Sequence, residues 1–206
     1  MNYMNYLDQV ATDLLTIIID QQDSEPIFTK NYGWENYRYV SPKFHHAHVQ
    51  VFKQPNFMVL HCSVFPNVTD PSPIFGFDVI CSEKKVTGVF LDLSPTTVKQ
   101  QKSFHNLTMD MNRDRPEWGD IFSEHWIAAR PNEEEMMAIC DEAKIVLEKY
   151  LNNLGTEVGN KEEIIAAQNY YCEQQSKNQH TFRMIKNLIG EELATEFVET
   201  VLFPKF

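Results

Sequence analysis

Two residues capable of proton transfer, His61 and Asp78, lie within apolar, β-prone segments of this chain, FMVLHCSVFP and PIFGFDVI. An unpaired carboxylate is costly to bury, and loss of water raises its pKa, so a buried aspartic acid can hold a proton near neutral pH. A histidine beside it would titrate together with it as a pair. The two residues therefore indicate a site that delivers protons to a bound substrate.

Both residues also have a purely structural explanation. His61 could be a core histidine with a hydrogen-bonded ring, and Asp78 could face solvent on an edge strand. No serine, Ser63 and Ser94 included, has a spacing that indicates an activated nucleophile. Taken alone, the residues lead to an aromatic-lined pocket that contains His61 and Asp78, without specifying a reaction.

Four histidines, His45, His46, His48 and His61, are close enough in sequence to suggest a metal site. Zinc usually takes three or four converging ligands, with cysteine or carboxylate among them. In an extended strand only His46 and His48 would share a face. The favoured interpretation is therefore a polar strand face that lines a pocket, and no metal ion is expected.

Arg113 and Arg115 lie in a polar, irregular segment, residues 98–117. The planar guanidinium group suits the geometry of a carboxylate, so either arginine could clamp an acidic group of a ligand. The alternative is that both arginines simply keep the surface soluble.

The 206 residues suffice for one domain with a large core, and we expect residues 1–206 to form it. The seven glycines form no phosphate-binding loop. A net charge of −11 argues against partners such as nucleic acid or an anionic membrane. Because no signal-like N-terminus, no long apolar segment and no CxxC pair occurs, we expect a cytoplasmic protein.

Hydrophobic periodicity predicts one helix, then five strands, then three helices, and the aromatic residues of segment 28–40 suggest a further strand with turns before those five. The helices are expected at residues 3–20, 133–151, 162–172 and 181–202, and the strands at 45–52, 57–65, 74–81, 86–93 and 121–129. Asn132 and Glu135 have the spacing of a capping box. Because the loops between strands are short, the strands should pair antiparallel, which gives an α+β fold.

The register between residues 45–52 and 57–65 decides whether Gln50 lies opposite His61. A hairpin loop of four residues would place both side chains on one face of the sheet. A loop of three residues would place them on opposite faces, because a shift of one residue reverses every side chain. The sequence leaves both alternatives open.

Six segments, in order from about Phe44 to Phe203, resemble the ferredoxin-dependent bilin reductases. They read FHHAHVQV, VLHCSVFP, PIFGFDVI, FLDLSPT, PEWGDIFSE and YYCEQQSKNQHTFR. Within that family they are most similar to the phycocyanobilin-forming enzymes, and the phage-type branch that forms phycoerythrobilin fits best. The resemblance implies a three-layer α/β/α sandwich with a central antiparallel sheet.

The resemblance also implies an activity. Biliverdin IXα would bind between the sheet and the C-terminal helices, in an enzyme with no bound metal or flavin. Reduced [2Fe-2S] ferredoxin would supply single electrons, and side chains would supply protons through bilin radicals. We expect a monomer.

Carried over residue by residue, the resemblance places the family's central aspartate at Asp78 and its partner histidine at His61. A second pocket histidine falls on His48, a propionate-binding arginine on Arg113, and a pocket-lining hydroxyl on Thr87. These five residues are the expected catalytic and substrate-binding set on the sheet and its loops.

The chain departs from the family pattern in two segments. Gln50 stands where phycocyanobilin-forming enzymes have a glutamate that serves reduction of the D-ring vinyl group, and an amide cannot donate a carboxyl proton. Asn178, Gln179 and His180 belong to a segment expected to contact the substrate, but Gln179 and His180 replace an aspartate and a lysine. This weakens transfer of A-ring proton donation or propionate pairing to that helix.

The leading hypothesis is therefore reduction of biliverdin to phycoerythrobilin by way of 15,16-dihydrobiliverdin. Phycocyanobilin formation, a stalled two-electron product and a non-catalytic bilin carrier are the alternatives. Because ferredoxin is itself acidic, docking should use a local basic rim. The candidates for that rim are Lys84, Lys85, Lys177, Arg183 and Lys186.

Overall fold

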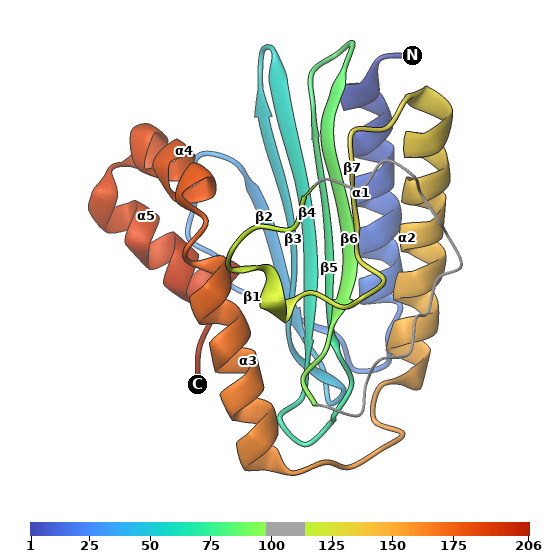
Figure 1. Cartoon of the computed structure of the whole chain (residues 1–206), viewed down its shortest axis with the longest axis vertical. Helices are drawn as coiled ribbons and strands as arrows, with labels where there is room; N and C mark the ends of the chain where they lie inside the picture. The colour runs from blue at the N-terminus through green and yellow to red at the C-terminus, as the bar shows by residue number, and fades with distance from the viewer. Residues whose placement is uncertain (98–113) are drawn as a thin grey trace.

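A seven-stranded antiparallel sheet forms the centre of the molecule in the computed structural model, which describes residues 1–97 and 114–206. Its strands lie side by side in chain order (Figure 1). They are β1 (Glu25–Ile27), β2 (Glu35–Val40), β3 (Phe44–Gln54), β4 (Phe57–Pro66), β5 (Ile74–Cys81), β6 (Val86–Ser94) and β7 (Ile127–Ala129). The antiparallel pairing predicted from short loops is confirmed.

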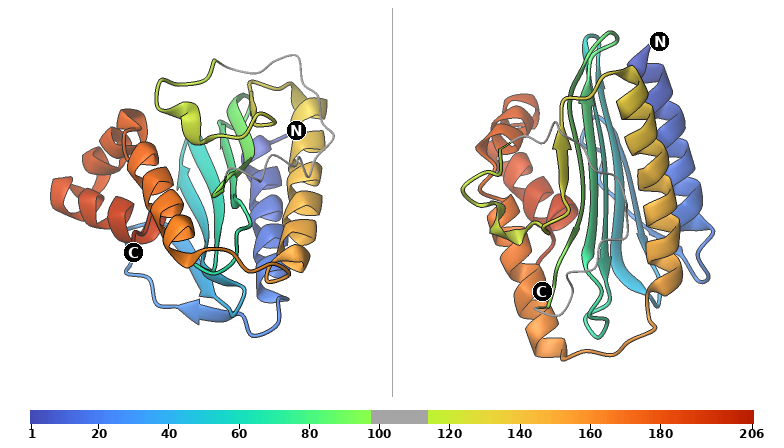
Figure 2. Two further views of the ribbon diagram at one scale, coloured as in Figure 1. Left: turned by 60° about the horizontal axis from the view of Figure 1, so that its bottom comes forward. Right: turned by 45° about the vertical axis from the view of Figure 1, so that its right-hand side comes forward.

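Helices cover both faces of this sheet, as Figure 2 shows in its edge-on view. Helices α1 (Tyr3–Ile19) and α2 (Glu133–Asn153) lie together on one face. Helices α3 (Lys161–Gln175), α4 (Gln179–Ile189) and α5 (Glu191–Phe197) lie on the other, followed by a π-helical turn, η2 (Val198–Leu202). The expected three-layer α/β/α sandwich is confirmed.

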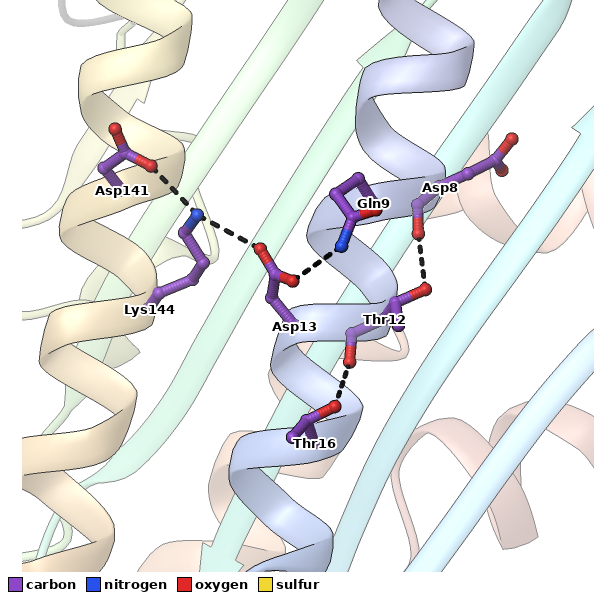
Figure 3. Close-up of polar contacts among 7 residues, drawn as sticks. All are labelled: Asp8, Gln9, Thr12, Asp13, Thr16, Asp141 and Lys144. Atoms are coloured by element: carbon purple, nitrogen blue, oxygen red, sulfur yellow. Dashed lines mark hydrogen bonds and ion pairs between the residues drawn. The ribbon is translucent and has the colours of Figure 1, made fainter.

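The larger core lies between the sheet and the pair α1–α2. Local signals start both helices, since the side chain of Asn2 accepts from the Met4 and Asn5 amides and the predicted Asn132–Glu135 capping box is present. Polar contacts connect the two helices at their solvent side (Figure 3).

Lys144 of α2 makes the connection between the two helices. Its Nζ lies 2.9 Å from a carboxylate oxygen of Asp141 on the same helix and 3.3 Å from one of Asp13 on α1. Gln9 donates to the other Asp13 oxygen at 2.9 Å (Figure 3). Exposed pairs of this kind add little stability, so burial of apolar side chains holds the layer together.

Two sequence-based boundaries are wrong. The expected strand at 121–129 is only β7, because the preceding residues form a 3₁₀ turn, Gly119–Ile121, and a loop. Arg115 holds that loop by donating to the carbonyls of Gly119, Phe122 and Ser123. The expected helix at 181–202 is broken at Gly190, where φ is +84°, a backbone conformation that glycine adopts readily.

Candidate functional site

Polar side chains gather on the sheet face that is turned toward α3, α4 and α5. The β3–β4 turn has two residues, since Gln54 pairs with Phe57, so neither of the loop lengths considered from the sequence is right. The register is nevertheless the one that a four-residue loop would give, and it places Gln50 opposite His61. His61 in turn pairs with Asp78 of β5. Because directly paired residues point to the same face, the three side chains form one row across the sheet. The question left open by the sequence is thereby resolved.

His61 is hydrogen-bonded at both ring nitrogens. Its Nδ1 lies 2.7 Å from a carboxylate oxygen of Asp78, and its Nε2 lies 3.2 Å from the hydroxyl of Ser63. A hydroxyl can donate or accept, so Ser63 can satisfy the ring whether or not that nitrogen carries a hydrogen. Ser63 is a contributor to the site that sequence reasoning did not identify.

Asp78 is less buried than expected. Its side chain is 39% exposed, whereas that of His61 is 11% exposed, so the prediction of a buried carboxylate is wrong for this structure. The alternative of an edge strand is also wrong, because β5 lies between β4 and β6. The carboxyl is therefore accessible on one side and held by a buried histidine on the other, as a proton donor to a ligand must be.

His48 is a fully buried neutral ring. Asn36 donates its amide to the Trp34 carbonyl at 3.2 Å, so its Oδ1 accepts from His48 Nε2 at 3.1 Å. This leaves His48 Nδ1 as a bare acceptor with no partner among the described residues. Burial lowers the pKa of His48 well below its usual range, helped by the neighbouring His61.

Gln50 is 3% exposed, and its Oε1 has no hydrogen-bond partner in the described part of the chain. A buried amide without a partner costs stability unless a ligand or water satisfies it. It stands beside His61 in the row that ends at Asp78. The substitution singled out from the sequence is thus at the site and not merely near it.

Tyr171 of α3 places a phenol on the same face. Its hydroxyl would lie 3.7 Å from a Cβ added at Gly76, which precedes Asp78 by two residues in β5. Gln175 donates to this hydroxyl at 2.9 Å, and burial raises the pKa of Tyr171 above its usual range. A glycine within a strand often marks such a close approach, so Gly76 was the available signal.

Asp92 of β6 holds the 114–126 loop at the edge of the site. Its carboxylate accepts from the Ser94 hydroxyl at 2.6 Å, and from the hydroxyl and amide of Ser123. Burial raises the pKa of Asp92, while the hydrogen bonds from Ser123 and Ser94 oppose that shift. The structure thus gives Asp92 a role in positioning a loop.

Thr87 lies outside the row of Gln50, His61 and Asp78, which continues on β6 at Phe90, so its part in lining the pocket stays a prediction. It is exposed at the start of β6, and its hydroxyl donates to the Ile80 carbonyl at 3.0 Å. Arg113 falls outside the described residues. The nearby Arg115 is committed to loop carbonyls and to the Trp126 ring, whose centre is 5.2 Å from the guanidinium carbon.

The Asn178 side chain caps α4 by accepting from the His180 and Thr181 amides. Gln179 and His180 are exposed on the first turn of that helix. Within the described residues, no hydrogen bond or ion pair joins these three side chains to His61 or Asp78, so their part in substrate binding stays a prediction.

The histidine cluster is not arranged for a metal ion. His45 bonds Gln168 at 2.9 Å, while the rings of His46 and His48 lie 6.0 Å apart and those of His48 and His61 5.4 Å apart. Among residues 1–97 and 114–206, no group of three or more potential ligands is placed to hold a metal. None of the helices in the same ranges is long and apolar enough to cross a membrane.

A hollow of about 700 Å³ lies away from this row, between α1 and strands β2 and β3. Within it Lys53 pairs with Asp8 at 2.5 Å, which leaves no free charge between them. None of the residues of the His61–Asp78 row lines it. We therefore base the functional site on the polar face and not on this hollow.

Comparison with known proteins agrees with this geometry. A model of the family "Ferredoxin-dependent bilin reductase" matches residues 9–204. Phycocyanobilin:ferredoxin oxidoreductase of Synechococcus sp. is 32% identical over 185 residues, covering 82% of this chain and 75% of the relative. The enzyme of the same name from Prochlorococcus marinus is also 32% identical, covering 80% and 77%. This chain belongs to the ferredoxin-dependent bilin reductase family.

Solved structures support the fold. A protein called PcyX superposes with a TM-score of 0.71 at 24% identity, covering 97% of this chain and 99% of that one. Phytochromobilin synthase from tomato, in complex with biliverdin, also gives 0.71 at 15% identity, covering 98% and 82%. At these identities the likeness concerns the fold alone. The predicted enzyme class, a ferredoxin-dependent bilin reductase, is confirmed by the family match and by the relatives at 32% identity.

Proposed function

We propose that this enzyme reduces biliverdin IXα to phycoerythrobilin by way of 15,16-dihydrobiliverdin, acting as a single domain. The observation that carries the choice of product is the position of Gln50, buried directly opposite His61 in the row that ends at Asp78. The family membership supports the substrate class and the electron donor.

Each of the two reductions consumes two electrons and two protons. Ferredoxin would supply the electrons one at a time, so protons must reach bilin radicals between electron transfers. The partly exposed Asp78 carboxyl would give a proton to the bilin, and His61, 2.7 Å away, would stabilise the carboxylate that is left. This assigns Asp78 the direct role and His61 the supporting one.

Gln50 then limits which part of the bilin is reduced. Its amide can hydrogen-bond a substrate but cannot release a proton at neutral pH. A carboxyl at this position would add a second acid on the far side of His61. Without it, the vinyl group of the D ring should survive, as it does in phycoerythrobilin.

The basic residues suggested for ferredoxin docking are not equally available. Lys186 is paired with Glu191 at 2.8 Å, and Lys177 donates to Gln174. Lys84 and Lys85 are exposed in the β5–β6 turn, and Arg183 is exposed on α4. We propose that these three residues carry more of the docking, which should weaken at high salt.

The test is anaerobic turnover of biliverdin IXα with reduced ferredoxin and a ferredoxin reductase, followed by chromatography. Co-elution with phycoerythrobilin is expected, and Gln50→Glu should then shift part of the product toward phycocyanobilin. Phycocyanobilin from the unaltered chain would show that Gln50 does not set the product. Bound but unreduced biliverdin would favour the carrier alternative. The two bilins are isomers, so absorbance and retention time, not mass, distinguish them.

A further inference from the structure

A positive charge with no anionic partner in residues 1–97 and 114–206 lies beneath the C-terminal helices. Arg38 of β2 is partly buried, and burial lowers the pKa of its guanidinium. Its Nε is buried with no hydrogen-bond partner among the described residues. None of the ion pairs formed within residues 1–97 and 114–206 includes Arg38. A buried cation is costly unless an opposite charge compensates it.

Two buried histidines flank this arginine. His48 is the cross-strand partner of Arg38, and His46 precedes it by two residues on the same face of β3. They are 0% and 1% exposed, and each has one ring nitrogen without a partner among the described residues, His48 Nδ1 and His46 Nε2. Burial is the main cause that lowers the pKa of both rings, and the charge of Arg38 contributes.

Arg38, His46 and His48 together form a polar patch, which α5 and η2 cover. The ring of His48 lies 6.4 Å from that of Phe197 in α5, and the backbone of Val201 in η2 acts on the pKa of His46. Glu196 of α5 is already bonded to Tyr32 and Lys30. The other titratable groups that act electrostatically on Arg38 and the two rings are Tyr32, His45 and His61, and Glu196 acts on Tyr32. No free carboxylate of the described chain is therefore available to Arg38.

We propose that Arg38, His46 and His48 bind a carboxylate side chain of the tetrapyrrole substrate. The inference rests on the proposed function, since it identifies how one acidic group of the bilin is held. Arg38 on β2 is three strands from Asp78 on β5, roughly 14 Å at the usual strand spacing. One elongated ligand lying across the sheet would connect the two.

The protonation of the histidine rings predicts that binding of the carboxylate is coupled to proton uptake. The Nδ1 of His48 carries no hydrogen, because Nε2 of the neutral ring donates to Asn36 Oδ1. A carboxylate would be repelled by such a lone pair unless a proton joined it. Binding of the acid should therefore take up a proton, and binding of the corresponding ester should not.

The test compares biliverdin IXα with its dimethyl ester in absorbance titrations. In Arg38→Gln, affinity for the acid should fall about tenfold to a hundredfold, as for loss of a charge-assisted bond. Affinity for the ester should change less than about twofold. Arg130→Gln, which removes an exposed arginine after β7, serves as the matched control and should bind both ligands as the unaltered chain does. Calorimetry in two buffers of different ionisation enthalpy should show proton uptake with the acid only.

Equal losses for acid and ester, or no loss, would overturn the assignment of Arg38. Binding of inorganic phosphate that depends on Arg38, together with equal binding of acid and ester, would assign the patch to a free anion instead. If Arg38→Gln does not fold, Arg38→Lys replaces it in the test, because lysine keeps the charge. Arg38→Lys should lose only part of the affinity for the acid and should leave the affinity for the ester unchanged. If the unaltered chain binds no biliverdin, the proposed function itself is wrong. If it binds biliverdin with an affinity that does not change in Arg38→Gln, only the role of Arg38 is wrong.

Discussion

The two faces of the central sheet are built from alternate residues of the same strands, yet they differ in kind. On β4, Leu60 and Cys62 point toward α1 and α2, where they are fully buried among apolar side chains. The residues between and after them, His61 and Ser63, point toward α3–α5. One face is an ordinary core, and the other keeps polar groups where a core would have none.

The two faces differ in how many of their buried polar atoms have hydrogen-bond partners. Toward α1 and α2, apolar burial is nearly complete and charged contacts such as those of Lys144 stay at the rim (Figure 3). Toward α3–α5, atoms of Arg38, His46, His48 and Gln50 are buried without partners in the described residues. Such groups lower stability and are retained where a ligand satisfies them. We therefore attribute stability mainly to the α1–α2 face and expect the α3–α5 face to bind the ligand.

The largest expected effect is on catalysis at the polar face. Asp78→Asn keeps the shape but cannot donate a proton, so turnover should fall at least about a hundredfold, with a bilin radical accumulating. Unfolding by urea should change little, because the side chain is partly exposed. Anaerobic absorbance spectra follow both substrate and radical. Full turnover by this variant would remove Asp78 from the mechanism.

Phe77, which precedes Asp78 in β5, allows a test of the sheet face that packs against α1 and α2. Phe77 is fully buried against the α1–α2 layer, so Phe77→Ala should cost about 3–5 kcal/mol of unfolding free energy. Biliverdin affinity of the folded fraction should change little, since the side chain points away from the polar row. Urea titration gives the first quantity and bilin absorbance the second. A variant that stays stable yet loses bilin binding would reverse the division between the faces.

The buried neutral histidines should make stability depend on pH. Folding lowers the pKa of His46 and His48, so below about pH 6.5 the unfolded chain takes up protons that the folded chain does not. Stability should therefore fall with acidification, by roughly 2 kcal/mol for the two rings between pH 6.5 and 5.5. His46→Gln should remove about half of this fall, whereas the exposed His180→Gln should leave it intact. A flat profile over that interval would argue against neutral buried rings.

The smallest effect is expected at Ser63, whose hydroxyl contacts His61 and which we expect to act through that ring and not on the substrate directly. Ser63→Ala removes the partner 3.2 Å from His61 Nε2, so kcat should fall about three- to tenfold while KM stays near its original value. Ser63→Thr keeps the hydroxyl and should restore most of the rate. A rise in KM without loss of kcat would instead mean that the serine binds substrate.

Much of the fold was predictable because its signals are local. The Asn132–Glu135 capping box and the alternation in residues 45–52 and 57–65 are properties of short segments, and the structure contains them as predicted. The break at Gly190 was missed, since apolar spacing continues through it while one glycine ends the helix. The strand expected at 121–129 failed for a similar reason, because hydrogen bonds from Arg115 outweigh its β-propensity.

The sequence by itself determined the family, the alternation of the strands and the presence of His61, Asp78 and Gln50, because these are matters of residue type and local spacing. Only the tertiary structure decided that a two-residue turn sets Gln50 opposite His61. It also decided that the Nε of Arg38 on β2 is buried with no hydrogen-bond partner in the part of the chain that the structure describes. Register and burial arise from contacts between distant segments, and no local pattern specifies which side chains such contacts leave unsatisfied.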